Sequence, residues 1–205
     1  MRRHADALAA LGRVEALHRV LDEIEAAPGN QGYELVEPIE VLDAYGHDDA
    51  VRGVVKRVIH WFEAKSTSEA GSIWRRHWYG RALFLAGRRD EALEVLDGLV
   101  EDAPGNIVNR TARAYVAANL GDTAQASLDL EWFEQTEFND GQAGSALYHR
   151  GIVKAALGHL DEAVELMRSS FDDPIWGYRW IGPTQIFTHP LREYGPYQEL
   201  MRPKG

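Results

Sequence analysis

Apolar residues recur at helical spacing along most of the chain. Two stripes show this most clearly, and their members are Leu93, Leu96, Leu99 and Val100 in one and Leu128, Leu130 and Phe133 in the other. A stripe of this kind is typical of an amphipathic helix. The β-branched stretch 54–59 has Lys56 and Arg57 at its centre, which fits helical spacing better than the strict alternation of a strand. The pattern therefore predicts an all-α protein.

A glycine separates one apolar segment from the next at five places. These glycines are Gly12, Gly46, Gly87, Gly121 and Gly158, at spacings of 34, 41, 34 and 37 residues. Glycine accepts the positive φ at which one helix ends and the chain turns back. The motif Ala-Pro-Gly-Asn at 27–30 returns at 103–106, where the proline ends a second helix. These features predict a series of antiparallel helical hairpins.

These residues resemble the tetratricopeptide repeats. The closest copy is a unit of 34 residues at 73–106, which carries Trp74, Gly80, Leu83, Gly87, Ala92, Leu96, Leu99 and Pro104. Weaker copies are at 1–31, 32–72, 107–140 and 144–173. The resemblance implies a right-handed α-solenoid of about five antiparallel helix pairs over residues 1–173, with 174–205 as a C-terminal capping segment.

The C-terminal segment differs from the repeats in composition. Residues 171–205 hold seven of the twenty aromatic residues of the chain. A solenoid needs its last apolar face covered, so we expect an irregular aromatic cap. The ending 189–205 is similar to the C-terminus of bacterial signalling proteins in which such repeats follow a kinase or a DNA-binding domain. Under this resemblance Gly205 is a native end and an effector domain precedes the chain.

Composition excludes several classes of protein. The 205 residues contain no cysteine and carry a formal net charge of −10. A disulfide framework, a zinc–thiolate site and a cysteine nucleophile are therefore absent, and the acidic balance disfavours nucleic-acid binding. No apolar run reaches the ~18 residues of a membrane span, and Asp6, Arg13 and Glu15 interrupt the stretch where a signal peptide would lie. We expect a cytoplasmic protein.

Motifs for catalysis, cofactors and metals are not found. The eight histidines never occur at the i, i+4 spacing that places two on one helix face. The segment 141–144 has two glycines without a following lysine, which indicates a loop and not a phosphate-binding cradle. Ser145 follows Gly144 but does not complete a G-x-S-x-G motif. We therefore expect a protein that is not an enzyme and that binds no cofactor or metal.

Charge is segregated between the two helices of each C-terminal unit. The first helices, at 73–86, 107–120 and 144–157, contain no acid and seven cations, which are Arg75, Arg76, Arg81, Arg110, Arg113, Arg150 and Lys154. The second helices contain sixteen acids and three cations. Two interpretations stay open. In the first, the groove is locally positive and binds an acidic partner, because first helices line the concave groove in the family. In the second, the cations form ion pairs with carboxylates of the second helices.

The N-terminal part has the opposite polarity. Its expected first helix carries Glu34, Glu37, Glu40 and Asp43. A groove graded from acidic to basic would suit an extended or helical partner segment of mixed charge.

The family pattern assigns a set of residues to the concave face. The partner-binding candidates are Trp74, His77, Arg81, Phe84, Tyr115, Asn119 and Tyr148. Aromatic residues with arginine are the usual composition of binding hot spots; the alternative for Trp74 and Phe84 is packing in the core. Family members that clamp carboxylate termini use Lys and Asn at groove positions held here by His77, Arg81, Ala112, Ser145 and His149, so we do not expect that clamp.

These observations lead to one expected function and two alternatives. We expect a non-catalytic protein–protein interaction module that binds a peptide or a partner domain in its concave groove. The first alternative is a homodimerisation module that uses the same surface or the capped end. The second is a ligand or peptide sensor that regulates a kinase or DNA-binding domain outside this chain.

Overall fold

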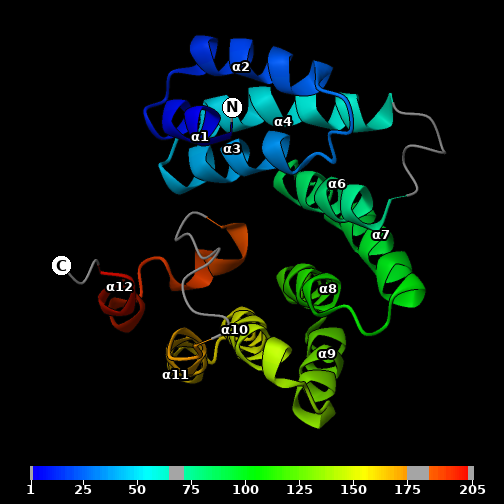
Figure 1. Cartoon of the computed structure of the whole chain (residues 1–205), viewed down its shortest axis with the longest axis vertical. Coiled ribbons are helices and arrows are strands. Elements are labelled where there is room, and N and C mark those ends of the chain that lie inside the picture. Colours follow the sequence, from blue (N-terminus) through cyan, green and yellow to red (C-terminus); the bar gives the residue numbers. More distant parts are fainter. Residues whose placement is uncertain (1, 65–71, 175–184, 203–205) are drawn as a thin grey trace. The chain divides into compact units, whose positions relative to one another are not determined.

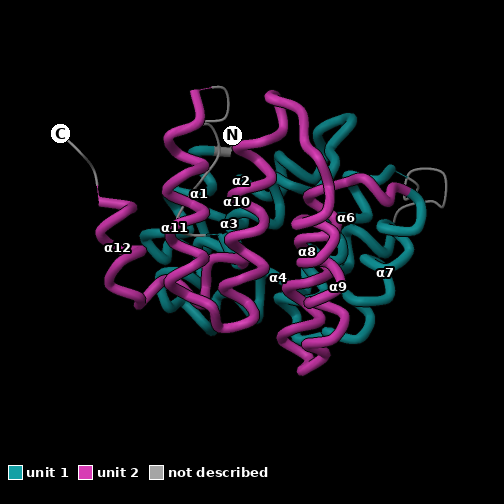
Figure 2. Tube along the Cα trace, turned by 90° about the horizontal axis from the view of Figure 1, so that it is seen from below, with its two compact units in different colours: residues 1–102, 184–186 teal, residues 103–183, 187–205 magenta. Residues whose placement is uncertain are grey.

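Helical pairs of the predicted kind form most of the described structure. A computed structural model describes residues 2–64, 72–174 and 185–202 (Figure 1). Within these ranges every regular element is a helix. The predicted all-α class is therefore confirmed, and successive helices pack as pairs, as expected for a repeat solenoid. The chain divides into two compact units, residues 1–102 with 184–186 and residues 103–183 with 187–205 (Figure 2).

The described residues of unit 1, 2–64 and 72–102, form three helix pairs. Its helices are α1 (Arg2–Ala10), α2 (Val14–Ala26), α3 (Tyr33–Ala44), α4 (Asp48–Glu63), α6 (Ile73–Leu85) and α7 (Arg89–Asp102). The first helices contact one another in order, α1 with α3 and α3 with α6, and each also contacts its own partner. The first helices therefore form a continuous layer within this unit.

Unit 2 repeats the arrangement with two pairs and a C-terminal segment. The pairs are α8 (Ile107–Asn119) with α9 (Thr123–Gln135) and α10 (Asp140–Ala156) with α11 (Leu160–Phe171). The first helices α8 and α10 again pack together. A 3₁₀ helix, η1 (Ile186–Leu191), and the short α12 (Gly195–Met201) follow, and α12 packs on α11. Residues 175–184 and 203–205 of the predicted capping segment lie outside the described residues.

Each pair reverses direction at a turn glycine. Gly12, Gly46, Gly87, Gly121 and Gly158 all have positive φ, between 62° and 87°. After each glycine the next N–H donates to a carbonyl five residues back, as from Arg88 to Leu83 at 2.9 Å. This is the bond that closes a helix when the following residue is left-handed. The predicted role of these glycines is thus explained by the backbone conformation that they adopt.

Small residues let the helices of a pair approach closely. A Cβ placed on Gly80 would lie 3.2 Å from the Leu96 side chain, and one placed on Gly151 would lie 3.0 Å from the Ala163 carbonyl oxygen. The core between the helices of unit 2 is also built on alanines, with members Ile107, Ala114, Ala126, Leu130, Phe133, Ala146 and Val153. One stripe residue does not take part: Leu128, expected among the apolar positions of its helix, is 58% exposed.

Two glycines offer a matched test of the turn conformation. A Cβ at Gly87 (φ +76°) or at Gly53, inside α4, would meet nothing within 4 Å. Gly87→Ala should lower the free energy of unfolding by about 1 kcal/mol, since a residue with a Cβ is strained at positive φ. Gly53→Ala should raise it by about 0.5–1 kcal/mol, because alanine favours a helix interior. Urea denaturation measures the change in the free energy of unfolding for each variant. Changes of the same sign would contradict the assignment of Gly87 to a left-handed turn.

The buried Tyr197 of α12 makes the C-terminal segment sensitive to alkaline pH. Burial raises the pKa of its phenol above the ordinary 10.0, and the weaker effects of the Thr188 hydrogen bond and the Arg192 charge oppose it. The folded state thus prefers the neutral phenol. Its contribution to stability is complete below the unfolded value and is lost as pH rises through the raised pKa.

Replacing the phenol tests this dependence. We expect the free energy of unfolding to fall between about pH 9 and about pH 11, and to fall less in Tyr197→Phe, which has no group to ionise. Urea denaturation at the two pH values gives the comparison. An identical decrease in both proteins would show that Tyr197 does not carry the effect.

Candidate functional site

The predicted binding residues are divided between the two units and differ in exposure. Trp74, on the first turn of α6, is 52% exposed, and Asn119 is exposed at the end of α8. The other five side chains are buried, and they are His77, Arg81, Phe84, Tyr115 and Tyr148. Of the two aromatic residues for which packing was the alternative, Phe84 is therefore packed and Trp74 is open to solvent.

A row of rings connects Trp74 to α3 within unit 1. The ring centroids of Trp74 and His77 are 6.2 Å apart, those of His77 and Trp78 are 5.4 Å apart, and those of Trp78 and Tyr33 are 6.2 Å apart. We call Tyr33, Trp74, His77 and Trp78 the aromatic row. The two contacts of His77 are edge-to-face and that of Tyr33 is tilted, and ring contacts of both kinds favour fixed orientations. The exposed indole of Trp74 thus stands on a rigid support.

Two members of the aromatic row were not among the predicted site residues. Trp78 is four residues after Trp74, so the two share one face of α6. That spacing was available in the sequence. Tyr33 comes from α3, and its position beside Trp78 follows only from the packing of α3 on α6.

Arg81 is bound inside unit 1 and does not face solvent. Its Nε donates to Glu40 Oε1 at 2.9 Å, and its Nη2 donates to the same oxygen. The two side chains are only 7% and 3% exposed. The Arg81 guanidinium also lies 4.3 Å from the Trp78 ring centroid, which is a cation–π contact. Arg81 therefore joins α6 to α3 and fixes the aromatic row.

The remaining first-helix cations also have partners. Arg110 and Arg113 both bind Asp129, which is fully buried on α9, at 2.9 and 2.6 Å. The other contacts are Arg76 with Asp102, Arg150 with Glu134, Lys154 with Glu162 and Arg75 with the Asn30 carbonyl. Most of these contacts join a first helix to a second helix. The structure thus favours ion pairing over a positively charged groove as the reason for the charge segregation.

The remaining candidates lie in unit 2. Tyr115, on α8, contacts Phe187 with ring centroids 5.0 Å apart, and Tyr148, on α10, stacks on Phe171 at 6.4 Å. The Asn119 side chain donates to the Tyr115 carbonyl at 2.9 Å, which caps the end of its own helix. In unit 2 the candidate face is therefore covered by residues of the chain itself.

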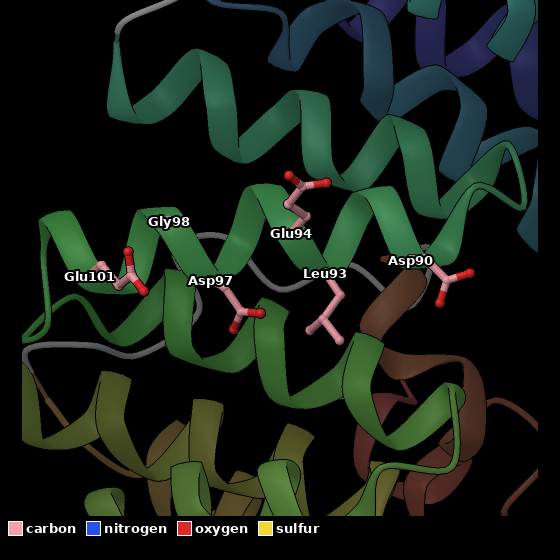
Figure 3. Close-up of a pocket in the computed structure, with 6 residues that line it drawn as sticks. All are labelled: Asp90, Leu93, Glu94, Asp97, Gly98 and Glu101. Carbon is pink, nitrogen blue, oxygen red and sulfur yellow. The ribbon is translucent and has the colours of Figure 1, made fainter.

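A shallow hollow lies along the second helix α7. Its volume is about 420 Å³, and it is lined by Asp90, Leu93, Glu94, Asp97, Gly98 and Glu101 (Figure 3). Four carboxylates surround a single leucine on one helix. This composition is typical of a solvated helix face, and none of these residues belongs to the predicted set.

Metal binding and membrane insertion find no support in the described residues. Among residues 2–64, 72–174 and 185–202, no group of three His, Asp or Glu side chains could hold a metal ion. Over the same ranges no helix has the length and hydrophobicity needed to cross a membrane.

The buried ion pair gives a test of what stabilises unit 1. Arg81→Met leaves the Glu40 carboxylate buried without its partner, which should lower the free energy of unfolding by about 3–5 kcal/mol. The double variant with Glu40→Leu removes both charges and should recover most of the loss. Arg52→Ala breaks an exposed pair with Asp49 and should cost less than about 1 kcal/mol. Similar losses for Arg81→Met and Arg52→Ala in urea denaturation would contradict this role.

Comparison with known proteins assigns a family to two segments. Residues 73–97 and 144–169 match the family model described as tetratricopeptide repeat. The first segment covers α6 and the first turns of α7, and the second covers most of α10 and α11. No curated protein and no solved structure matches the chain. The two matches, one in each unit, support a protein of the tetratricopeptide-repeat type.

Proposed function

We propose that this protein is a non-catalytic protein-interaction module that holds a partner segment against the first helices of its repeats. Tetratricopeptide repeats are generally protein-interaction modules, and the two matched segments bring that expectation to this chain. The observation that carries the proposal is the exposed Trp74 within the first matched segment. Stacked helix pairs offer an extended surface for binding.

Trp74 has the properties of a binding anchor. Half of its surface is exposed to solvent. The His77 ring, which contacts it, is fully buried. The half-buried Trp78 contacts His77 in turn and continues the aromatic row toward α3. Large exposed hydrophobic side chains on a rigid support lose little conformational entropy when a partner covers them. Tryptophan is also among the residues that most often dominate binding energy.

The charges beside the aromatic row set the chemistry of the partner. Glu34 is half-buried on α3, next to Tyr33, and the nearby Arg81 is already neutralised by Glu40. Opposite charges steer and orient binding partners. We therefore propose that the partner is a mixed-charge segment, with an apolar residue that packs on Trp74 and a basic residue that lies near the carboxylate on α3.

Alanine substitution tests the anchor. The purified chain is immobilised and used to capture proteins from the lysate of its source organism, and the captured partner is then titrated. Trp74→Ala should weaken binding at least about tenfold, as expected for loss of a hot spot. The matched control is Leu128→Ala, which removes a side chain of similar exposure (58%) from the second helix α9 and should leave binding unchanged.

Three measurements decide the outcome. Far-ultraviolet circular dichroism must show that both variants keep the wild-type helix content. Equal binding by Trp74→Ala and wild type would remove the aromatic row from the proposal. Light scattering over a range of concentrations detects self-association, and a dimer that Trp74→Ala dissociates would identify a second copy of the chain as the partner.

A further inference from the structure

Within unit 2, the C-terminal segment 187–202 lies on the repeats as a bound peptide would. Its buried residues within this unit are Phe187, Thr188, Leu191, Tyr197 and Leu200. Between them His189 and Glu193 are exposed. One side of the segment therefore faces the repeats and the other faces solvent, although η1 and α12 belong to no helix pair.

Phe187 covers a residue that the sequence pattern assigns to partner binding. Its ring meets the Tyr115 ring edge-on, with an interplanar angle of 61° and centroids 5.0 Å apart. Ala114, one residue earlier, packs in the core between α8, α9 and α10. One residue is about 100° of helix rotation, so Tyr115 points to a different side of α8. On that side the Phe187 ring contacts it, and Tyr115 is only 2% exposed.

A second attachment holds the other end of the segment. The Tyr194 hydroxyl donates to the Asp161 carboxylate, in the first turn of α11. The short α12 packs on α11 and buries Tyr197. The segment thus contacts the repeats through aromatic side chains at both ends, near α8 and near α11.

We propose that residues 187–202 are an intramolecular ligand of unit 2, and that the face around Tyr115 binds a partner segment of the same kind. Such a segment carries an aromatic residue in the place of Phe187 and an aliphatic residue four positions later, in the place of Leu191. The proposal rests on the proposed function, because it names a second binding face of the same module. It differs in its site, since Trp74 belongs to unit 1.

Covalent attachment explains why this face is covered in the free protein. A tethered segment has an effective concentration on the order of millimolar. A free segment with the same contacts must compete with it, and its apparent affinity falls by the fraction of molecules whose face is open. Weakening the internal contact should therefore strengthen binding of an external segment.

A labelled synthetic peptide of residues 187–202 tests this competition in the full chain. Phe187→Ala weakens the contact between the C-terminal segment and unit 2, and it leaves the binding face around Tyr115 unchanged. Fluorescence anisotropy should show that this variant binds the peptide at least about tenfold more tightly than the wild-type chain does. A control peptide that itself carries Phe187→Ala should not bind. Adding Tyr115→Ala to the Phe187→Ala chain should abolish binding.

A second variant separates opening from unfolding. Tyr194→Phe removes the hydrogen bond to Asp161 and leaves both Phe187 and Tyr115 in place. It should raise peptide affinity by a smaller factor than Phe187→Ala, with unchanged helix content. If both variants lose helix content, or if neither binds the peptide better than wild type, the segment is only a structural cap and the proposal is wrong.

The outcome is independent of the partner experiment on unit 1. Trp74→Ala in the Phe187→Ala chain should leave peptide affinity unchanged, because Trp74 lies in unit 1. Failure of the peptide experiment therefore leaves the Trp74 proposal standing. If Trp74→Ala abolishes partner capture and leaves peptide binding unchanged, the surface at Trp74 and the face around Tyr115 bind independently.

Discussion

The architecture depends on five reversals of the chain that occupy only three residues each. At each one a glycine holds a positive φ and the next amide closes the preceding helix. A side chain at that place would strain the backbone. Because the connection is so short, the two helices it joins must lie antiparallel and in contact. The close contact in turn requires small residues between the helices, as at Gly80 and Gly151.

Once the helices are in contact, their charges are used to hold the pairs together. Asp129 shows this most clearly, because it is fully buried on α9 and receives two arginines from α8. A buried carboxylate without such partners would be costly. The same logic binds Arg81 to Glu40 across α6 and α3. The opposite signs of first and second helices are thus explained by internal pairing, and the net charge of −10 says little about the surface that a partner meets.

The two units treat their aromatic first-helix residues differently. In unit 1 the row of rings ends in an open indole, Trp74, supported from below by buried His77. In unit 2 the ring of Tyr115 is covered by Phe187 from the end of the same chain. We propose the first surface as the anchor for an external segment, and the second as a face that an external segment reaches by replacing Phe187. The two proposed surfaces differ in accessibility, because Trp74 is exposed and Tyr115 is buried.

The sequence by itself determined the helical class and the positions of the reversals, because both depend on local properties. Helical spacing of apolar residues and the left-handed conformation of glycine act within a few residues of the chain. The resemblance to the repeat family assigned Trp74, Arg81 and Tyr115 to one face of their helices. It did not show what covers that side, since the covering groups come from distant parts of the chain.

Only the tertiary structure decided which of those side chains remain available. Glu40, 41 residues before Arg81, removes that arginine from solvent, and Tyr33 joins the aromatic row because α3 packs on α6. Phe187 covers Tyr115 from the C-terminal segment. Helix period fixes the direction of a side chain relative to its own axis, whereas exposure depends on how the other helices pack around it. For that reason the fold could be predicted from the sequence, while the exposure of the candidate binding residues required the structure.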